Sequence, residues 1–301
     1  MTLAHRASHR ILLTVALVAI VASTSSVRAA TPAKTKYALA YKFKMGEVLR
    51  YQVEHATNVR TTIDGKTQQT ESLSESTKAW KVTDVLPDGE REFVPLVESV
   101  RMTNDTPGGP SHSYDSAKDS SPPPGFEGVA AAVNVPISVV RISPSGEVVS
   151  REEKHPQPVA SKDMPITLPL PAQPIAVGER WSNVYDVPAE RKGGAKIAVR
   201  TRRICKLVAV KNGVATISVE YNILTPVDPF VRSQLVDRLT TGKVRFDLEA
   251  GRIVEQRHSG DTRVLGFAGQ ASSMHFASRF EERLLPVDSD AVSKASHTTT
   301  K

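Results

Sequence analysis

The chain has 301 residues, of which 40% are hydrophobic and 24% are charged, and its formal net charge is +7. This composition is ordinary for a globular protein, and it excludes global disorder, collagen-like repeats and a polytopic membrane protein. Basic and acidic residues are interspersed, whereas nucleic-acid binders gather Lys and Arg into a stripe, so we expect no nucleic-acid partner. Aromatic residues make up only 5%, which predicts a mostly aliphatic core.

Residues 1–29 have the three-part layout of a secretory signal peptide. Basic residues come first, an apolar run from Ile11 to Ala22 follows, and small or apolar residues precede a cleavage site between Ala29 and Ala30. The run is shorter than the roughly 20 residues that span a bilayer as a helix. We therefore expect export to the periplasm or the extracellular space and no transmembrane span in the mature chain. An uncleaved membrane anchor is the alternative.

After a flexible N-terminus at residues 30–35, residues 36–153 form the first predicted β-rich half. Apolar and polar residues alternate over 47–54, which indicates a strand with one buried face. Turn signals such as Asp64-Gly65 supply the positive φ that tight hairpins need. A short helix is expected near 126–134. The stretch 104–125, rich in Pro, Gly, Ser and Asp, predicts a mobile surface loop.

A proline-rich connector at 154–174 leads to the second predicted β-rich half, residues 175–286. Alternation over 215–223 and 243–248 indicates two further strands. A polar tail at 287–301 is expected to be disordered.

One helix is predicted in the second half, over residues 229–241. Asp228 suits the cap position, and Pro229 suits the first helical position. Apolar residues recur every four residues on one face, and Gly242 follows as the stop signal. The three residues of that face are Val231, Leu235 and Leu239. The pattern leaves open whether this helix belongs to the core or forms a lid.

A weak internal repeat relates the two halves. Phe43 to Glu47 matches Ile175 to Glu179, Trp80 to Gly89 matches Cys205 to Gly213, and Val139 to Val149 matches Lys243 to Val254. The helices fall between the second and third blocks in both halves. We therefore expect a mainly β fold: a curved antiparallel sheet or half-barrel built from two duplicated halves, with the helices packed across one face.

No catalytic or metal-binding motif is present: the sequence contains no Gly-x-Ser-x-Gly, no His-Glu-x-x-His and no phosphate-binding loop. The eight histidines are scattered, and those in predicted strands are interpreted as solvated or hydrogen-bonded residues rather than ligands. These are His55, His258 and His275. We expect no metal and no cofactor.

Three further features have structural interpretations. Arg200 to Arg203 is interpreted as a charged strand face, and Cys205, the only cysteine, as a buried thiol that forms no disulfide. The pairs Glu152-Glu153 and Glu281-Glu282 are adjacent in sequence, so in strands their side chains point to opposite faces and make no acid–base couple.

The layout resembles an uncharacterised exported bacterial β-rich family, known as a domain of unknown function. The residues that carry the likeness are Phe-x-x-Gly-Glu-x-x-x-Tyr at 43–51, Trp-x-Val-x-x-Val-x-x-Asp-Gly at 80–89 and Val-Glu-Ser-Val-Arg-Met at 97–102. These motifs mark strands and turns, so the resemblance implies a bacterial exported β protein and brings no catalytic residues.

Two function classes follow. The first is an exported non-enzymatic protein that binds an apolar ligand or an envelope partner. The alternative is an exported hydrolase whose residues converge only in three dimensions. A carrier needs an apolar cleft, whereas an enzyme needs a polar cleft with a perturbed acid or base. The sequence leaves the oligomeric state open.

Overall fold

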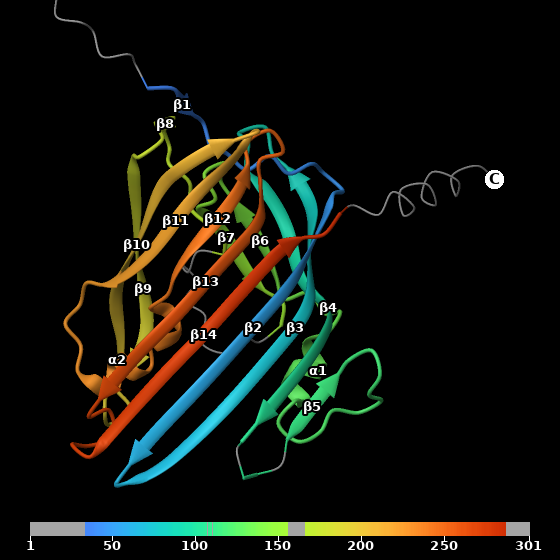
Figure 1. Cartoon of the computed structure of the whole chain (residues 1–301). Coiled ribbons are helices and arrows are strands. Elements are labelled where there is room, and N and C mark those ends of the chain that lie inside the picture. Colours follow the sequence, from blue (N-terminus) through green and yellow to red (C-terminus); the bar gives the residue numbers. More distant parts are fainter. Residues whose placement is uncertain (1–33, 107, 110, 156–165, 287–301) are drawn as a thin grey trace, which may run out of the picture. The chain divides into compact units, whose positions relative to one another are not determined.

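The computed structural model describes residues 34–106, 108–109, 111–155 and 166–286 (Figure 1). It confirms a mainly β protein with a large antiparallel sheet of 12 strands and two short α-helices. Within these ranges, no helix is long and apolar enough to cross a bilayer. The predicted signal peptide, its cleavage site at Ala29 and Ala30 and the polar tail at 287–301 lie outside the described residues.

The strands are long and follow the chain in simple up-and-down order. The first half contains β2 (Val48–Ile63), β3 (Lys66–Val85), β4 (Arg91–Asp105), β5 (His112–Asp115), β6 (Ser138–Ile142) and β7 (Val148–Glu153). The second half contains β9 (Arg180–Glu190), β10 (Lys196–Lys211), β11 (Val214–Ile223), β12 (Thr241–Asp247), β13 (Arg252–Leu265) and β14 (Ser272–Leu284). A separate two-stranded sheet pairs β1 (Lys36–Tyr37) with β8 (Ile175–Ala176).

The sheet runs in the order β7-β6-β4-β3-β2-β14-β13-β12-β11-β10-β9, and β5 adds to β4. Each half is therefore a meander, and the two halves meet where β2 pairs with β14 from Tyr51–Leu284 to Ile63–Ser272. In each half a helix lies between the third and fourth strands of the meander, α1 (Glu127–Ala132) in the first and α2 (Pro229–Ser233) in the second. The two halves thus share one strand order.

The first repeat block forms the same turn in both halves. The amide of Gly46 donates to Val82 O at 3.1 Å, and the amide of Gly178 donates to Leu207 O at 2.8 Å. Val82 and Leu207 are the positions that the sequence repeat aligns. Both glycines have positive φ, which non-glycine residues adopt only at a cost. The equivalence of the halves therefore extends to individual hydrogen bonds, and their origin by duplication stays a prediction.

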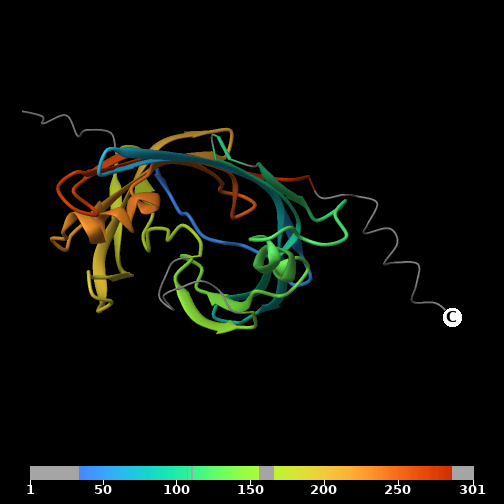
Figure 2. The same cartoon turned by 90° about the horizontal axis from the view of Figure 1, so that it is seen from below.

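The sheet is curved, and both helices pack on its inner face (Figure 2). The main core lies on this face, where chain segments before β2 and before β8 cross beneath the strands. It is mostly aliphatic, as expected, but its aromatic residues gather into one contacting group. They are Tyr41, Phe43, Tyr51, Trp80, Phe93 and Phe246.

The predicted helix over 229–241 is wrong beyond Ser233. After α2 the chain forms a 3-10 turn, η1 (Val236–Arg238), and then enters β12 at Thr241. Thr241 pairs with Glu220 of β11 and Ser259 of β13. These hydrogen bonds to both neighbouring strands stabilise the extended conformation from Thr241 onward. They outweigh the helical preference that the periodicity of the local sequence indicates. Gly242, expected as a helix stop, is a residue of β12.

The expected surface loop over 104–125 contains a strand. Asn104 and Asp105 continue β4, and β5 pairs with β4, with Thr103 opposite Ser113. Tyr114 of β5 is buried against Phe126, which precedes α1. This small apolar cluster holds the segment against the sheet, an effect that the local composition does not reveal.

The last part of the proline-rich connector is also packed rather than exposed. Leu168 and Leu170 are buried in the main core, and the Tyr41 hydroxyl donates to Leu168 O at 3.0 Å. The amide of Leu170 donates to Ser145 O at 2.7 Å. The segment thus crosses the interior and lines the smaller of the two voids described below.

Candidate functional site

A cavity of about 350 Å³ lies on the inner face of the sheet, between the strands and η1. Its volume is at the lower end of the range for small-molecule sites. The lining side chains are a mixture of polar, charged and aromatic groups. They are His55, Tyr185, Arg203, Tyr221, Asp237, Arg238, Thr240, Gln256, His258, Ser278 and Phe280.

Arg203 of β10 lines the cavity and is only 9% exposed. Its guanidinium lies over the rings of Tyr185 at 5.7 Å and Tyr221 at 5.2 Å, and Nη1 donates to Thr167 O at 3.1 Å. Its Nε is buried and has no hydrogen-bond partner among the described residues. Arg203 is therefore a buried cation whose hydrogen-bonding capacity is incompletely used.

Two histidines face the cavity from either side of Phe280. Phe280 of β14 pairs with His55 of β2 and with His258 of β13, with ring centroids 6.0 and 6.1 Å apart. Burial lowers the pKa of both histidines, and for His258, where the nearby positive charge of Arg203 adds to the effect, the pKa falls to about 4. Both rings are thus neutral at pH 7.

The His258 ring fits because its neighbour in β12 is a glycine. A Cβ on Gly242 would lie 2.4 Å from His258 Nδ1 and 2.3 Å from Arg257 O. The ring's Nε2 lies 3.2 Å from Gln256 Oε1, and its buried Nδ1 has no partner in the described part of the chain. Gly242 therefore has a packing role in the site and no role in ending a helix.

A smaller void of about 90 Å³ adjoins the cavity and shares Arg203, Tyr221, Gln256 and His258 with it. Glu282 of β14, 2% exposed, lies here and forms an ion pair with Lys78 of β3. Gln256 Nε2 also donates to Glu282 Oε1 at 2.9 Å. Glu282 forms its ion pair with Lys78, although Oε2 has no hydrogen-bond partner among the described residues. No ion pair joins Glu282 to Arg203, so the charge of Arg203 is not compensated by it.

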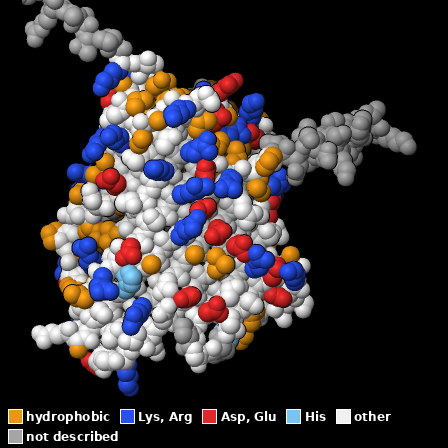
Figure 3. Space-filling model, viewed as in Figure 1, with side chains coloured by type: hydrophobic (Ala, Val, Ile, Leu, Met, Phe, Trp, Pro, Cys, Tyr) orange, Lys and Arg blue, Asp and Glu red, His pale blue; other side chains and the backbone are white. Residues whose placement is uncertain are grey.

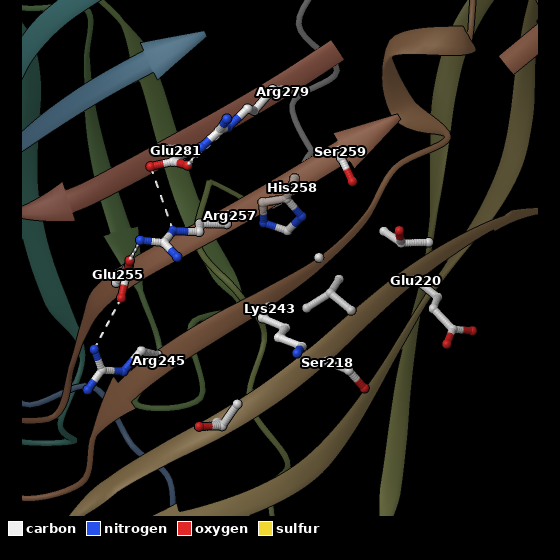
Figure 4. Close-up of a pocket in the computed structure, with 14 residues that line it drawn as sticks. Ser218, Glu220, Lys243, Arg245, Glu255, Arg257, His258, Ser259, Arg279 and Glu281 are labelled. Atoms are coloured by element: carbon white, nitrogen blue, oxygen red, sulfur yellow. Dashed lines mark hydrogen bonds and ion pairs between the residues drawn. The ribbon is translucent and has the colours of Figure 1, made fainter. Parts of the chain in front are cut away.

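The opposite face of the sheet has a larger groove of about 620 Å³ (Figure 4). Most of its charges pair with one another: Arg245 with Glu255 at 3.1 Å, and Arg257 with Glu281 at 3.6 Å. Across this face positive and negative side chains are mixed (Figure 3). Most of the charges in the groove are thus paired, and the other two, Lys243 and Glu220, are exposed. We place the candidate site in the inner cavity, where Arg203 Nε and His258 Nδ1 are buried without hydrogen-bond partners in the described chain.

The other residues singled out in the sequence are not part of this site. His275 is separate from the other two strand histidines, with Nε2 3.0 Å from Asp261 Oδ1. Burial raises the pKa of the Cys205 thiol to about 12, so it is no nucleophile at neutral pH. Glu281 and Glu282 lie on opposite faces, as expected, and Glu152 and Glu153 are exposed. In the described ranges, no group of three His, Cys, Asp or Glu side chains is placed to hold a metal ion.

The interpretation of Arg200 to Arg203 as a charged strand face is wrong for Arg203. Arg200 and Arg202 are exposed, whereas Arg203 is buried on the inner face with Cys205 and Leu207. Side chains two residues apart share a face of a strand. The apolar character of positions 205 and 207 was therefore the signal in the sequence that placed Arg203 inside.

Comparisons with known proteins show no family for this chain. No protein-family model and no curated protein matches it. A lipovitellin structure described by its lipid–protein interactions has a TM-score of 0.43 and 11% identity, over 81% of this chain and 26% of that one. The chain thus spans about a quarter of lipovitellin's length. A DUF1329 family protein from Desulfovibrio piger has a TM-score of 0.15 and 14% identity, over 81% of this chain and 90% of that one. At these scores neither likeness carries an argument about function.

Proposed function

We propose that this protein is an exported, non-enzymatic binding protein that holds a small molecule on the inner face of its curved sheet. The observation that supports this function is the cavity between the strands and η1. Aromatic rings form part of its wall, and polar groups converge on it from β2, β10, η1, β13 and β14. Concave sites with a few oriented polar groups are typical of small-molecule binding.

The mixed lining changes the kind of ligand expected. A wholly apolar cleft would suit an apolar ligand, but Arg203, Gln256 and His258 contribute polar groups to this one. We therefore propose an amphiphilic ligand, with its apolar part against rings such as that of Phe280. An envelope protein as the partner receives no specific support from the described surface, where charges are mixed and paired.

The hydrolase alternative receives less support from the site. Ser278 lines the cavity together with the two histidines, but among the described residues no hydrogen bond joins its hydroxyl to either ring. Activation of a serine needs a base within hydrogen-bond reach. The depressed pKa of His258 also makes it a weak base at neutral pH.

Native mass spectrometry of the full chain, purified without denaturant from cells that export it, tests this function. We expect a small-molecule adduct that disappears in Ser278→Trp, which fills the cavity. Ala277→Trp is the matched control, because the preceding residue of β14 points to the opposite face. An adduct that survives Ser278→Trp contradicts the proposal. Ester hydrolysis that is lost in His258→Asn would favour the alternative.

Export itself is a proposal that rests on residues 1–29. N-terminal sequencing of protein recovered outside the cytoplasm should begin at or next to Ala30. Recovery of a chain that keeps Met1 would contradict signal cleavage.

A further inference from the structure

The charge balance of the inner cavity leaves one cation without a counterion. Asp237 and Arg238 of η1 pair with each other at 3.3 Å. In the adjoining void, Lys78 and Glu282 pair in the same way. Arg203 forms no ion pair with any described carboxylate, so its positive charge is the one that remains.

A buried guanidinium in this state is costly to the fold. Removing a charge from water costs several kcal/mol, and hydrogen bonds or a counterion normally offset the loss. Here one carbonyl and two aromatic faces offset part of it, and Nε remains without a partner in the described chain. An anion in the cavity would supply the missing interaction.

We propose that the cavity binds a small organic acid and that Arg203 holds its carboxylate group. This inference rests on the proposed binding function and names the chemical class of its ligand. A guanidinium binds a carboxylate through two parallel N–H donors, and Nε provides one that is unused.

The rest of the lining defines the body of the acid. Tyr185 and Tyr221 flank the guanidinium, and Phe280 forms part of the wall farther along the sheet. Flat rings pack well against a planar or short-chain apolar group. The volume of about 350 Å³ favours a ligand of small-molecule size.

Calorimetric titration of the full chain with 3-phenylpropionate, and with the neutral 3-phenylpropanamide as the matched ligand, tests this inference. The two probes differ in charge and share their apolar body. A charge-assisted hydrogen bond contributes enough for a preference of about tenfold or more for the acid. Octanoate in place of 3-phenylpropionate distinguishes an acyl body from an aryl body.

The variants assign that preference to one side chain. Arg203→Met, which keeps the length and removes the charge, should abolish the preference, so that acid and amide bind with equal affinity. Arg203→Lys keeps the charge but loses the planar guanidinium, so it should retain part of the preference. This variant also tests the inference if Arg203→Met does not fold. Arg202→Met is the matched control, because this neighbour is exposed on the outer face.

Each result decides between the two proposals. Equal binding of acid and amide overturns the carboxylate site and leaves the binding function intact. Displacement of the acid by inorganic phosphate alone, at the same concentration and with the same dependence on Arg203, overturns the organic part of the inference. If neither the acids nor the amide bind although native protein carries an adduct, the ligand class is wrong. If no adduct is found either, the binding function fails with it.

Discussion

At the scale of single residues, polar and charged groups share the inner face of this sheet with the apolar core. His258 shows what burial of a polar group costs. Its ring lies against Gly242, and burial disfavours the protonated form of the imidazole. Tyr41 and Tyr51 are also buried, and burial raises the pKa of both phenols above the ordinary value. These groups are all neutral at pH 7, so the charges of the interior are confined to a few positions.

The depressed pKa of His258 predicts acid sensitivity. Between its ordinary pKa of 6.5 and about 4, the unfolded chain binds a proton that the folded chain does not. Stability should therefore be full above about pH 6.5 and fall as the pH drops towards 4, by roughly 3 kcal/mol for this group. His55, whose pKa is also lowered, adds in the same direction.

Urea unfolding of wild type, His258→Asn and His275→Asn at pH 7 and pH 5 checks this dependence. His258→Asn should lose less stability than wild type between the two pH values. His275, whose side chain is 38% exposed, serves as the control, and its variant should follow the wild type. Identical pH dependence in all three proteins would show that His258 titrates normally in the folded state.

At the scale of elements, short structures gain their stability from the sheet on which they pack. α2 has five residues, too few to be stable alone, yet Val231 and Leu235 are buried against Val187 of the edge strand β9 and Val199 of β10. The Gln234 side chain adds two hydrogen bonds to the backbone of Glu190. This segment is therefore part of the core at that end of the sheet.

Leu235→Ala tests whether this segment belongs to the core. Leu235 is 2% exposed, and truncation of a buried leucine costs about 2–5 kcal/mol, so we expect a clear loss in a denaturant titration. Leu224→Ala is a suitable control, because Leu224 is 39% exposed and should change stability little. An unchanged midpoint for Leu235→Ala, with altered uptake of an apolar fluorescent probe, would instead identify the segment as a lid.

The repeated turn before β2 and before β9 gives a second prediction at this scale. Gly46 and Gly178 have φ values of +76° and +97°, and a Cβ at either would meet open space. Gly46→Ala and Gly178→Ala should therefore each cost only the backbone strain, about 1–2 kcal/mol.

Gly128 of α1 provides the matched control for both turns. It also faces open space, but its φ is helical, so Gly128→Ala should be neutral or slightly stabilising. A large difference between Gly46→Ala and Gly178→Ala in thermal unfolding would mean that the two turns are not energetically equivalent.

At the scale of the whole molecule, the seam between β2 and β14 makes one sheet from two meanders. The pairing runs along the whole of β14, from Ser272 to Leu284. The ion pair between Lys78 and Glu282 and that between Glu47 and Arg252 also cross from one half to the other. Neither half therefore buries its inner face alone.

Separate expression of residues 36–174 and 175–286 tests this interdependence, because the first fragment then keeps Leu168 and Leu170 of the core. Each fragment exposes a long strand edge at the seam, so we expect it to be aggregated or unfolded on its own. Mixed fragments should recover the far-ultraviolet circular dichroism and the elution volume of the intact chain. A cooperatively folded monomer of either fragment would show that the seam is an interface between independent domains.

The sequence by itself determined the elements whose signals are local. Alternation of apolar and polar residues located β11 and β12. The pairs Asp64-Gly65 and Asn212-Gly213 located tight hairpins, because Asn, Asp and Gly readily adopt the positive φ that both turn positions have. The repeat likewise anticipated a common strand order for the two halves.

Only the tertiary structure decided where local signals compete with pairing or depend on distant neighbours. The helix expected up to 241 ends at Ser233 because β11 and β13 pair with Thr241 and the residues after it. The surroundings of Arg203 come from Thr167, Tyr185 and Tyr221, which lie on separate segments and meet only when the sheet curves. Alternation indicates which face a side chain takes, but its partners on that face come from distant segments that the curved sheet brings together.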